Sequence, residues 1–169
     1  MAQQFPEMFV DADSFRVSRE SVLLACELRA ALAACIYDET QGVGGLLQLR
    51  YVAMSNDQPL DLTDNTLSSD VLLMDRFCKE LRREGARKHS WRVSIVAHTP
   101  QQAGMQAPAA TVLDLVKAYF SDARLPIECK ELQCEPGLAV KLHAREGLMW
   151  VTGAPGAAAG IRLAASAIA

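Results

Sequence analysis

Cysteine and histidine are the residue types in this chain that could carry nucleophilic or metal chemistry. The five cysteines are Cys26, Cys35, Cys78, Cys129 and Cys134. Their odd number, the lack of a Cys-x-x-Cys pair and their mostly apolar neighbours indicate buried small side chains, not disulfides or a zinc site. The histidines, His89, His98 and His143, lie far apart and form no His-x-x-x-His pair. We therefore expect no metal site and no cofactor.

The first half of the chain, which would have to position these side chains, is rich in strand signals. Short apolar runs between polar turns predict strands at residues 7–10, 15–18, 21–29, 32–37 and 43–54. The glycine-ended turn between the last two predicts a hairpin. Residues 21–35 are also rich in Ala and Leu, so one continuous helix there remains an alternative on propensity alone. We favour two strands with a tight bend at residues 29–31.

In the second half, apolar residues recur at spacings of three and four. This period predicts amphipathic helices over residues 68–84, ended by Gly85, and over residues 109–120. Further strands are predicted at residues 91–97, 125–133, 138–143 and 148–151. The order of elements predicts an α+β or mixed α/β fold: a single layered domain with a sandwich-like β-sheet core flanked by two main helices.

The length of 169 residues suits one domain, which we place at residues 1–152. The remaining residues, 153–169, form a tail rich in Ala and Gly. The sequence leaves two possibilities open for this tail, a frayed segment or a short packed helix.

The overall charge is mildly acidic, with a net value of -3 and a pI near 5.6. Such a chain lacks the general positive field that nucleic-acid binding requires, so we expect no nucleic-acid partner. No apolar run approaches a membrane-spanning length and no signal peptide is visible, so we expect a cytoplasmic protein without membrane insertion. The basic run Arg82, Arg83, Arg87 and Lys88 follows the first predicted helix. We interpret it as a solvated helix end in preference to a binding patch.

Several motifs carry a family resemblance that covers about residues 7–152. They are FRVSRE at 15–20, LAACIYD at 32–38, GVGGL at 42–46, KELRREGA at 79–86 and LMWV at 148–151. With these motifs the chain resembles the CheD family of bacterial chemotaxis proteins, which are chemoreceptor glutamine deamidases. The resemblance implies a CheD-like fold, a protein-glutamine glutaminase ancestry and a partner that is either a chemoreceptor cytoplasmic region or another chemotaxis protein.

The positions that carry catalysis in that family are changed. Ala31 stands at the place of the nucleophilic cysteine, Gln48 at that of the general-base histidine and Ala25 at that of the orienting threonine. A methyl group cannot attack an amide, and a glutamine amide cannot exchange protons near neutral pH. The resemblance therefore implies a catalytically inactive homologue that acts by binding. We expect a shallow depression near Ala25, Ala31, Gln48 and His98, with Gln48 and His98 as binding residues.

Two alternatives remain. The protein could be an active deamidase with a relocated site, in which Cys26 or Cys35 is the nucleophile and His98 the base. If side chains alternate through the bend, Ala25, Ala31 and Cys35 share one face and Cys26 points to the other. The protein could also bind a small ligand outside chemotaxis.

Overall fold

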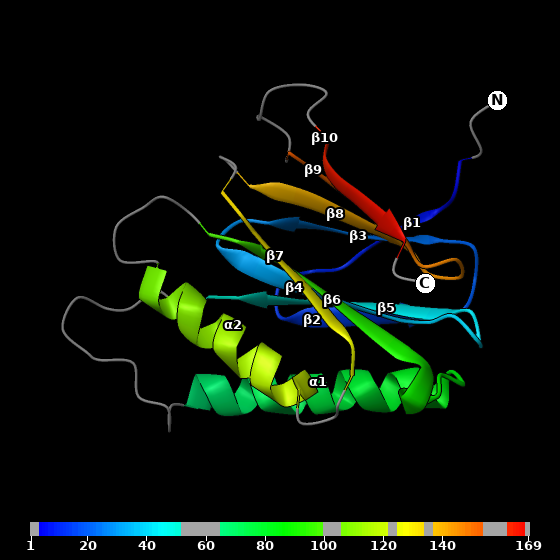
Figure 1. Cartoon of the computed structure of the whole chain (residues 1–169), viewed down its shortest axis with the longest axis horizontal. Helices are drawn as coiled ribbons and strands as arrows, with labels where there is room; N and C mark the ends of the chain where they lie inside the picture. The colour runs from blue at the N-terminus through cyan, green and yellow to red at the C-terminus, as the bar shows by residue number, and fades with distance from the viewer. Residues whose placement is uncertain are drawn as a thin grey trace.

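The protein forms three layers, shown from top to bottom in Figure 1 as two stacked β-sheets and a layer of helices. The structure is a computed structural model. It describes residues 4–51, 65–99, 106–121, 125–133, 137–153 and 162–167, without the side chains of residues 65–68, 106–107 and 162–167.

Each sheet has five strands. Sheet A has the order β1 (Glu7–Phe9), β3 (Leu23–Leu28), β8 (Leu138–His143), β9 (Leu148–Gly153), β10 (Arg162–Ala167). Sheet B has the order β2 (Ser14–Ser18), β5 (Val43–Arg50), β4 (Ala31–Asp38), β6 (Trp91–His98), β7 (Ile127–Leu132). The helices are α1 (Asn65–Arg83), the short 3-10 helix η1 (Lys88–Ser90) and α2 (Gln106–Ser121). Helices α1 and α2 lie against the face of sheet B that points away from sheet A (Figure 1).

The central strand β4 is buried on both faces along its whole length. Its even-numbered residues, such as Leu32 and Ile36, pack into the apolar cluster beneath the helices. Its odd-numbered residues, such as Ala31 and Cys35, pack into a second cluster between the two sheets. A strand covered on both faces needs a continuous apolar run instead of an alternating one, and the sequence of β4 meets that need.

Two adjacent glycines in β5 let the outer layers approach sheet B closely. A Cβ added at Gly44 would lie 2.6 Å from the carbonyl oxygen of Ala144, at the end of β8. A Cβ added at Gly45 would lie 2.5 Å from a ring carbon of Phe77, on α1. Because strand residues alternate between faces, the pair gives clearance to sheet A on one side and to the helix layer on the other.

Helix α1 ends at Arg83, and Gly85 terminates it as the sequence predicts. Gly85 has a φ of +101°, in the region that favours glycine. The N–H of Ala86 donates to the carbonyl of Leu81 over 2.9 Å, and the N–H of Gly85 donates to that of Arg82 over 3.0 Å. These two bonds form a Schellman motif, which satisfies carbonyls that the helix end would leave unpaired.

The mixed α+β class with two helices is confirmed, and so is the preference for strands in residues 21–37. One continuous helix there is wrong, because β3 and β4 belong to different sheets and are joined by a corner at Arg29 and Ala30. Ala30 has a φ of +53°. Its N–H donates to His98 Nδ1 over 3.0 Å, and its carbonyl accepts from the N–H of Tyr51, also over 3.0 Å. These bonds hold the corner in its left-handed conformation.

Part of the C-terminal segment is neither frayed nor helical. Residues Arg162–Ala167 form β10, which pairs antiparallel with β9 and is an edge strand of sheet A. Ala and Gly are both uncommon in strands, so the composition of this segment did not predict one. The domain boundary after residue 152 stays a prediction.

The glycine pair gives a test of the three layers. We expect Gly44→Ala to lower the free energy of unfolding by about 1–3 kcal/mol, because its methyl group would meet backbone atoms that cannot move aside. Gly45→Ala should cost less, because the Phe77 ring can rotate away. Chemical denaturation of both variants measures the difference. Unchanged stability in Gly44→Ala would mean that the two sheets do not approach each other at this point.

Candidate functional site

Three of the residues expected to form the site are buried, and two of them make hydrogen bonds to backbone groups. Ala31, Gln48 and His98 are each at most 4% exposed. Gln48 Nε2 donates to the carbonyl of Val10 over 2.9 Å, which ties β5 to the segment after β1. His98 Nδ1 accepts the N–H of Ala30 at the β3–β4 corner. The amide and the imidazole thus stabilise the backbone in places that solvent does not reach.

The structure corrects the faces expected for the strand before the corner. Cys26 lies in the cluster between the sheets together with Ala31 and Cys35. Its neighbour Ala25 points to the other face of sheet A, so it does not share a face with Ala31. Alternation does not carry through the bend because the chain changes sheets there. Ala25, Ala31, Gln48 and His98 are all buried, and the depression expected beside them stays a prediction.

The relocated thiol site also lacks the chemistry it would need. Burial, with smaller contributions from Cys35 and Glu27, raises the pKa of Cys26 well above its ordinary value. Burial raises the pKa of Cys35 to about 12. Because the thiolate is the nucleophile, this raised pKa opposes a nucleophilic role for either cysteine near neutral pH.

The structure instead contains an open pocket of about 520 Å³ where α1, α2 and the start of β6 meet. We call it the helix pocket. It is lined by Asp75, Cys78, Lys79, Arg82, Lys88, Trp91, Tyr119, Phe120 and Leu125. These residues come from four elements, α1, η1, β6 and α2, and from the connection that follows α2, which explains why no local motif marks them.

The inner wall of the helix pocket is aromatic. Trp91 and Phe120 are each 1% exposed, and Leu125 lies beside them in the lining. The guanidinium carbon of Arg82 lies 5.6 Å from the centre of the Trp91 ring. That distance is within the range of a cation–π interaction, so Arg82 is held over the ring with its outer side toward solvent.

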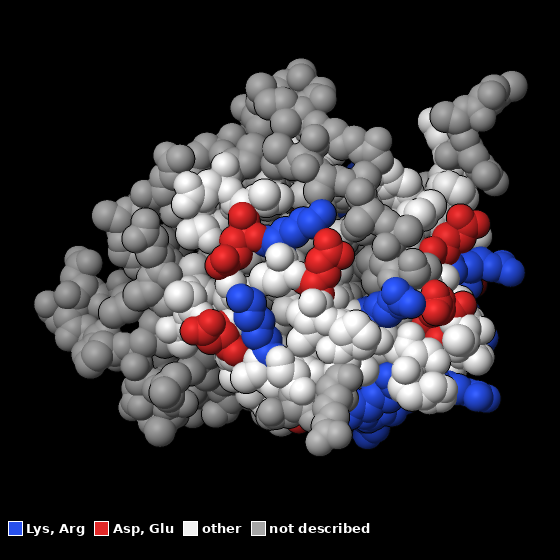
Figure 2. Space-filling view, viewed as in Figure 1, with Lys and Arg blue, Asp and Glu red and all other residues white. Residues whose placement is uncertain are grey.

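The mouth of the helix pocket is cationic. Lys79, Arg82 and Lys88 are exposed, and none of them takes part in an ion pair within the described residues. Figure 2 shows blue side chains at the lower right of the molecule, where α1 ends and β6 begins. Unpaired cations at the mouth of a concave site attract anions.

The single carboxylate in the lining already has a partner. Tyr119 donates its hydroxyl to Asp75 Oδ1 over 2.5 Å. Burial and this hydrogen bond raise the pKa of Tyr119, so the hydroxyl stays a neutral donor. Burial also raises the pKa of Cys78, against the opposing effect of Arg82. The pocket therefore offers cations and hydrogen-bond donors, but no thiolate nucleophile.

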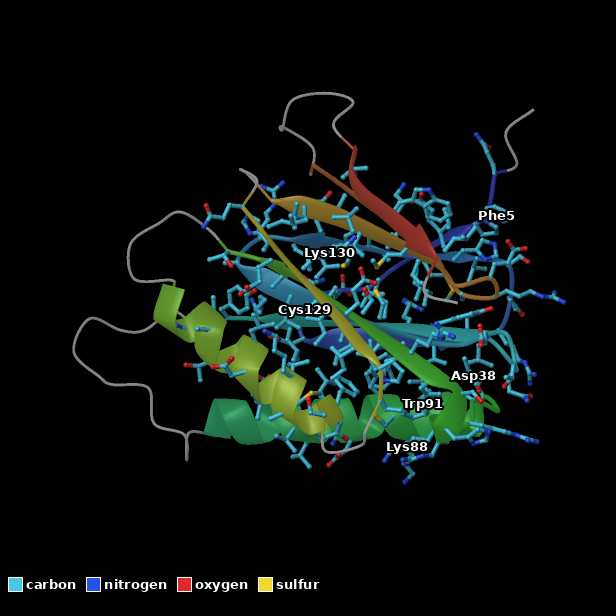
Figure 3. The ribbon with its side chains drawn as sticks, in the orientation of Figure 1. Phe5, Asp38, Lys88, Trp91, Cys129 and Lys130 are labelled. Carbon is cyan, nitrogen blue, oxygen red and sulfur yellow. The ribbon has the colours of Figure 1, made fainter. Side chains whose placement is uncertain are left out.

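A buried aspartate fixes the connection that carries Lys88 and Trp91. Asp38 accepts the N–H of Arg87 over 2.6 Å and also bonds to Thr40 and Gln41 in its own turn. Burial alone would raise the pKa of Asp38, but these hydrogen bonds outweigh it and the pKa is lowered. Figure 3 shows Asp38, Lys88 and Trp91 grouped near the end of α1. By binding the backbone of Arg87, the Asp38 carboxylate fixes the position of the segment that carries the lining residues Lys88 and Trp91.

Metal-binding clusters and membrane-spanning helices are the next two features to consider. No group of three or more His, Cys, Asp or Glu side chains that could hold a metal ion occurs among the described residues. No helix in the described part of the chain has the length and apolar character needed to cross a membrane.

Comparison with known proteins assigns no family. No protein-family model matches the chain, and no curated protein matches it. The hypothetical protein YfiH of Bacillus licheniformis aligns with a TM-score of 0.47 and 11% identity over 69% of this chain. A Neisseria meningitidis protein of the family DUF152 aligns with a TM-score of 0.48 and 8% identity over 77% of it. The chain spans 49% and 64% of those two proteins.

These findings correct the assignment to the CheD family. The structures found are YfiH and a DUF152 protein, not CheD proteins, and no family model supports the motifs on which the resemblance was based. The interpretation as an inactive chemoreceptor deamidase with a role in chemotaxis is therefore wrong. The expected chemoreceptor partner rested on that assignment alone.

The basic run singled out in the sequence contributes to the helix pocket, although we predicted a solvated helix end for it. The basic run that we interpreted as a solvated helix end includes Arg82 and Lys88, which line the pocket. The signal was present in the spacing, because Cys78 and Arg82 lie one helical turn apart and Trp91 follows shortly after Lys88. The contribution of Tyr119 depends on how α2 crosses α1, which the sequence does not specify.

Alkylation tests whether the buried thiols can act. In the native protein at pH 8 we expect iodoacetamide to modify Cys129, which is partly exposed, well before Cys26 or Cys35. A pKa near 12 reduces the thiolate of Cys35 on the order of a thousandfold relative to a free cysteine. Peptide masses after timed alkylation give the order, and the unfolded protein is the control. Rapid labelling of Cys35 in the native protein would instead support a relocated site with Cys35 as the nucleophile.

Proposed function

We propose that this protein is a binding protein whose helix pocket takes a small aromatic anion. The observation that supports this most directly is the pairing of an aromatic inner wall, Trp91 and Phe120, with a mouth of three unpaired cations. The volume of about 520 Å³ lies within the range usual for small-molecule sites. The apolar wall would hold a ring, and the cations would hold the charge.

The local charge supports an anion even though the whole chain is acidic. The net charge of the chain is -3, so the gathering of Lys79, Arg82 and Lys88 in one lining is a local departure from the average. At the surface of a protein, each such cation within about 4 Å of an anion contributes on the order of a few kcal/mol before desolvation is subtracted. Binding should therefore weaken as the salt concentration rises.

Binding is favoured over catalysis by the state of the groups in the pocket. Cys78 is held as a thiol and the Tyr119 hydroxyl as a neutral donor to Asp75. General acid–base chemistry near neutral pH needs a group that titrates there, and the lining residues include no histidine. The cations and donors suffice to hold a ligand.

Two neighbouring arginines on α1 provide the test. Arg82 lines the pocket, whereas the Arg83 side chain is 80% exposed and lies outside the lining. With benzoate as the ligand, we expect Arg82→Gln to raise the dissociation constant about tenfold, because a charge-assisted contact is worth roughly 1.5–3 kcal/mol. Arg83→Gln should change it less than twofold.

The chain provides its own spectroscopic reporter for this measurement. Its two tryptophans are Trp91, in the pocket wall, and Trp150, on sheet A. In a Trp150→Phe background, excitation at the red edge of tryptophan absorption follows Trp91 alone while benzoate is titrated at low salt. Equal effects of Arg82→Gln and Arg83→Gln, or no change in Trp91 emission at millimolar benzoate, would contradict the proposal.

A further inference from the structure

We infer that the ligand of the helix pocket is an aryl phosphate, a small planar ring that carries a phosphate monoester. This inference rests on the proposed function and narrows it from aromatic anions in general to one chemical class. It follows from three features of the described lining residues: their charge balance, the cation–π contact between Arg82 and Trp91, and the indole N–H of Trp91, which lacks a partner within the described residues.

The charge balance favours a ligand with two negative charges. Lys79, Arg82 and Lys88 face one carboxylate, Asp75, whose Oδ1 is occupied by the Tyr119 hydroxyl. Among the described lining residues the formal excess is two positive charges, and a carboxylate ligand would balance only one of them. A phosphate monoester carries about -1.5 to -2 near pH 7 and presents three strong acceptor oxygens at one point. Arginine and lysine are the usual partners of such a group.

The Arg82–Trp91 contact favours a planar body. The planar guanidinium of Arg82 has its central carbon 5.6 Å from the centre of the indole ring, and it makes no ion pair within the described residues. A ring can stack on the guanidinium or enter against Phe120 and Leu125. Inorganic phosphate alone would fill only a small part of a pocket of about 520 Å³ and would leave the apolar wall wet.

The wall also contains a donor that lacks an acceptor. Within the described residues, the indole Nε1–H of Trp91 is buried and makes no hydrogen bond. A buried donor without an acceptor is destabilising, because it has lost its hydrogen bond to water. A phosphate oxygen that enters beside Trp91 could satisfy this N–H after a small side-chain adjustment, and a purely apolar ligand could not. Arg82, Lys88 and Trp91 thus all line the pocket with groups that pair with an anionic oxygen.

A matched series of probes tests the inference on the full chain in the Trp150→Phe background. The probes are phenyl phosphate, benzoate, phthalate, phenol and inorganic phosphate, and Trp91 emission gives each dissociation constant. We expect phenyl phosphate to bind at least tenfold more tightly than every other probe. Arg82→Gln and Lys88→Gln should each weaken phenyl phosphate at least tenfold, and Arg83→Gln should leave it within twofold.

Further variants separate the contributions of charge and stacking. Arg82→Lys keeps the charge but removes the planar surface, so we expect it to weaken phenyl phosphate while leaving inorganic phosphate unchanged. If benzoate or phthalate binds as tightly as phenyl phosphate and Arg82→Gln weakens it, the phosphate assignment is overturned and the proposed function stands. If no probe changes Trp91 emission, both are overturned. Thermal unfolding of each variant shows whether it retains the native fold.

Discussion

The burial of β4 on both faces is the constraint on which the rest of the structure depends. A strand that has apolar side chains on both sides must be covered on both sides, and here sheet A covers one face and the helices cover the other. The glycines at positions 44 and 45 bring these covers close, because a side chain at either would strike Ala144 or Phe77. The layered form is thus the consequence of one central strand.

The same constraint decides where chemistry can occur. The space between the sheets is filled by apolar residues with Cys26 and Cys35 among them, and burial there keeps both thiols protonated. Gln48 uses its side-chain amide in that region to satisfy the carbonyl of Val10. The surface where the two helices meet the end of β6 is different, because its aromatic wall is reached through a cationic mouth. The proposed ligand site therefore lies at this surface.

The sequence predicted what depends on local period. The strands of the first half follow from short apolar runs between polar turns, the two helices from apolar spacings of three and four, and the stop at Gly85 from the conformational freedom of glycine. It could not predict which face Ala25 occupies, because that depends on the change of sheet at Arg29 and Ala30. It also could not predict the helix pocket as a whole. Arg82 and Tyr119 meet there only because two helices distant in sequence cross over the same sheet.

The most direct test of this account is to map where a ligand binds. Phenyl phosphate titrated into the ¹⁵N-labelled full chain should shift the indole Nε1–H resonance of Trp91 and the backbone amides of Arg82, Lys88 and Tyr119. The amides of Ala31 and Gln48, between the sheets, should stay in place. Shifts confined to the β3–β4 corner and β5, with Trp91 unchanged, would show that the interior and not the helix pocket receives the ligand, and would contradict the account.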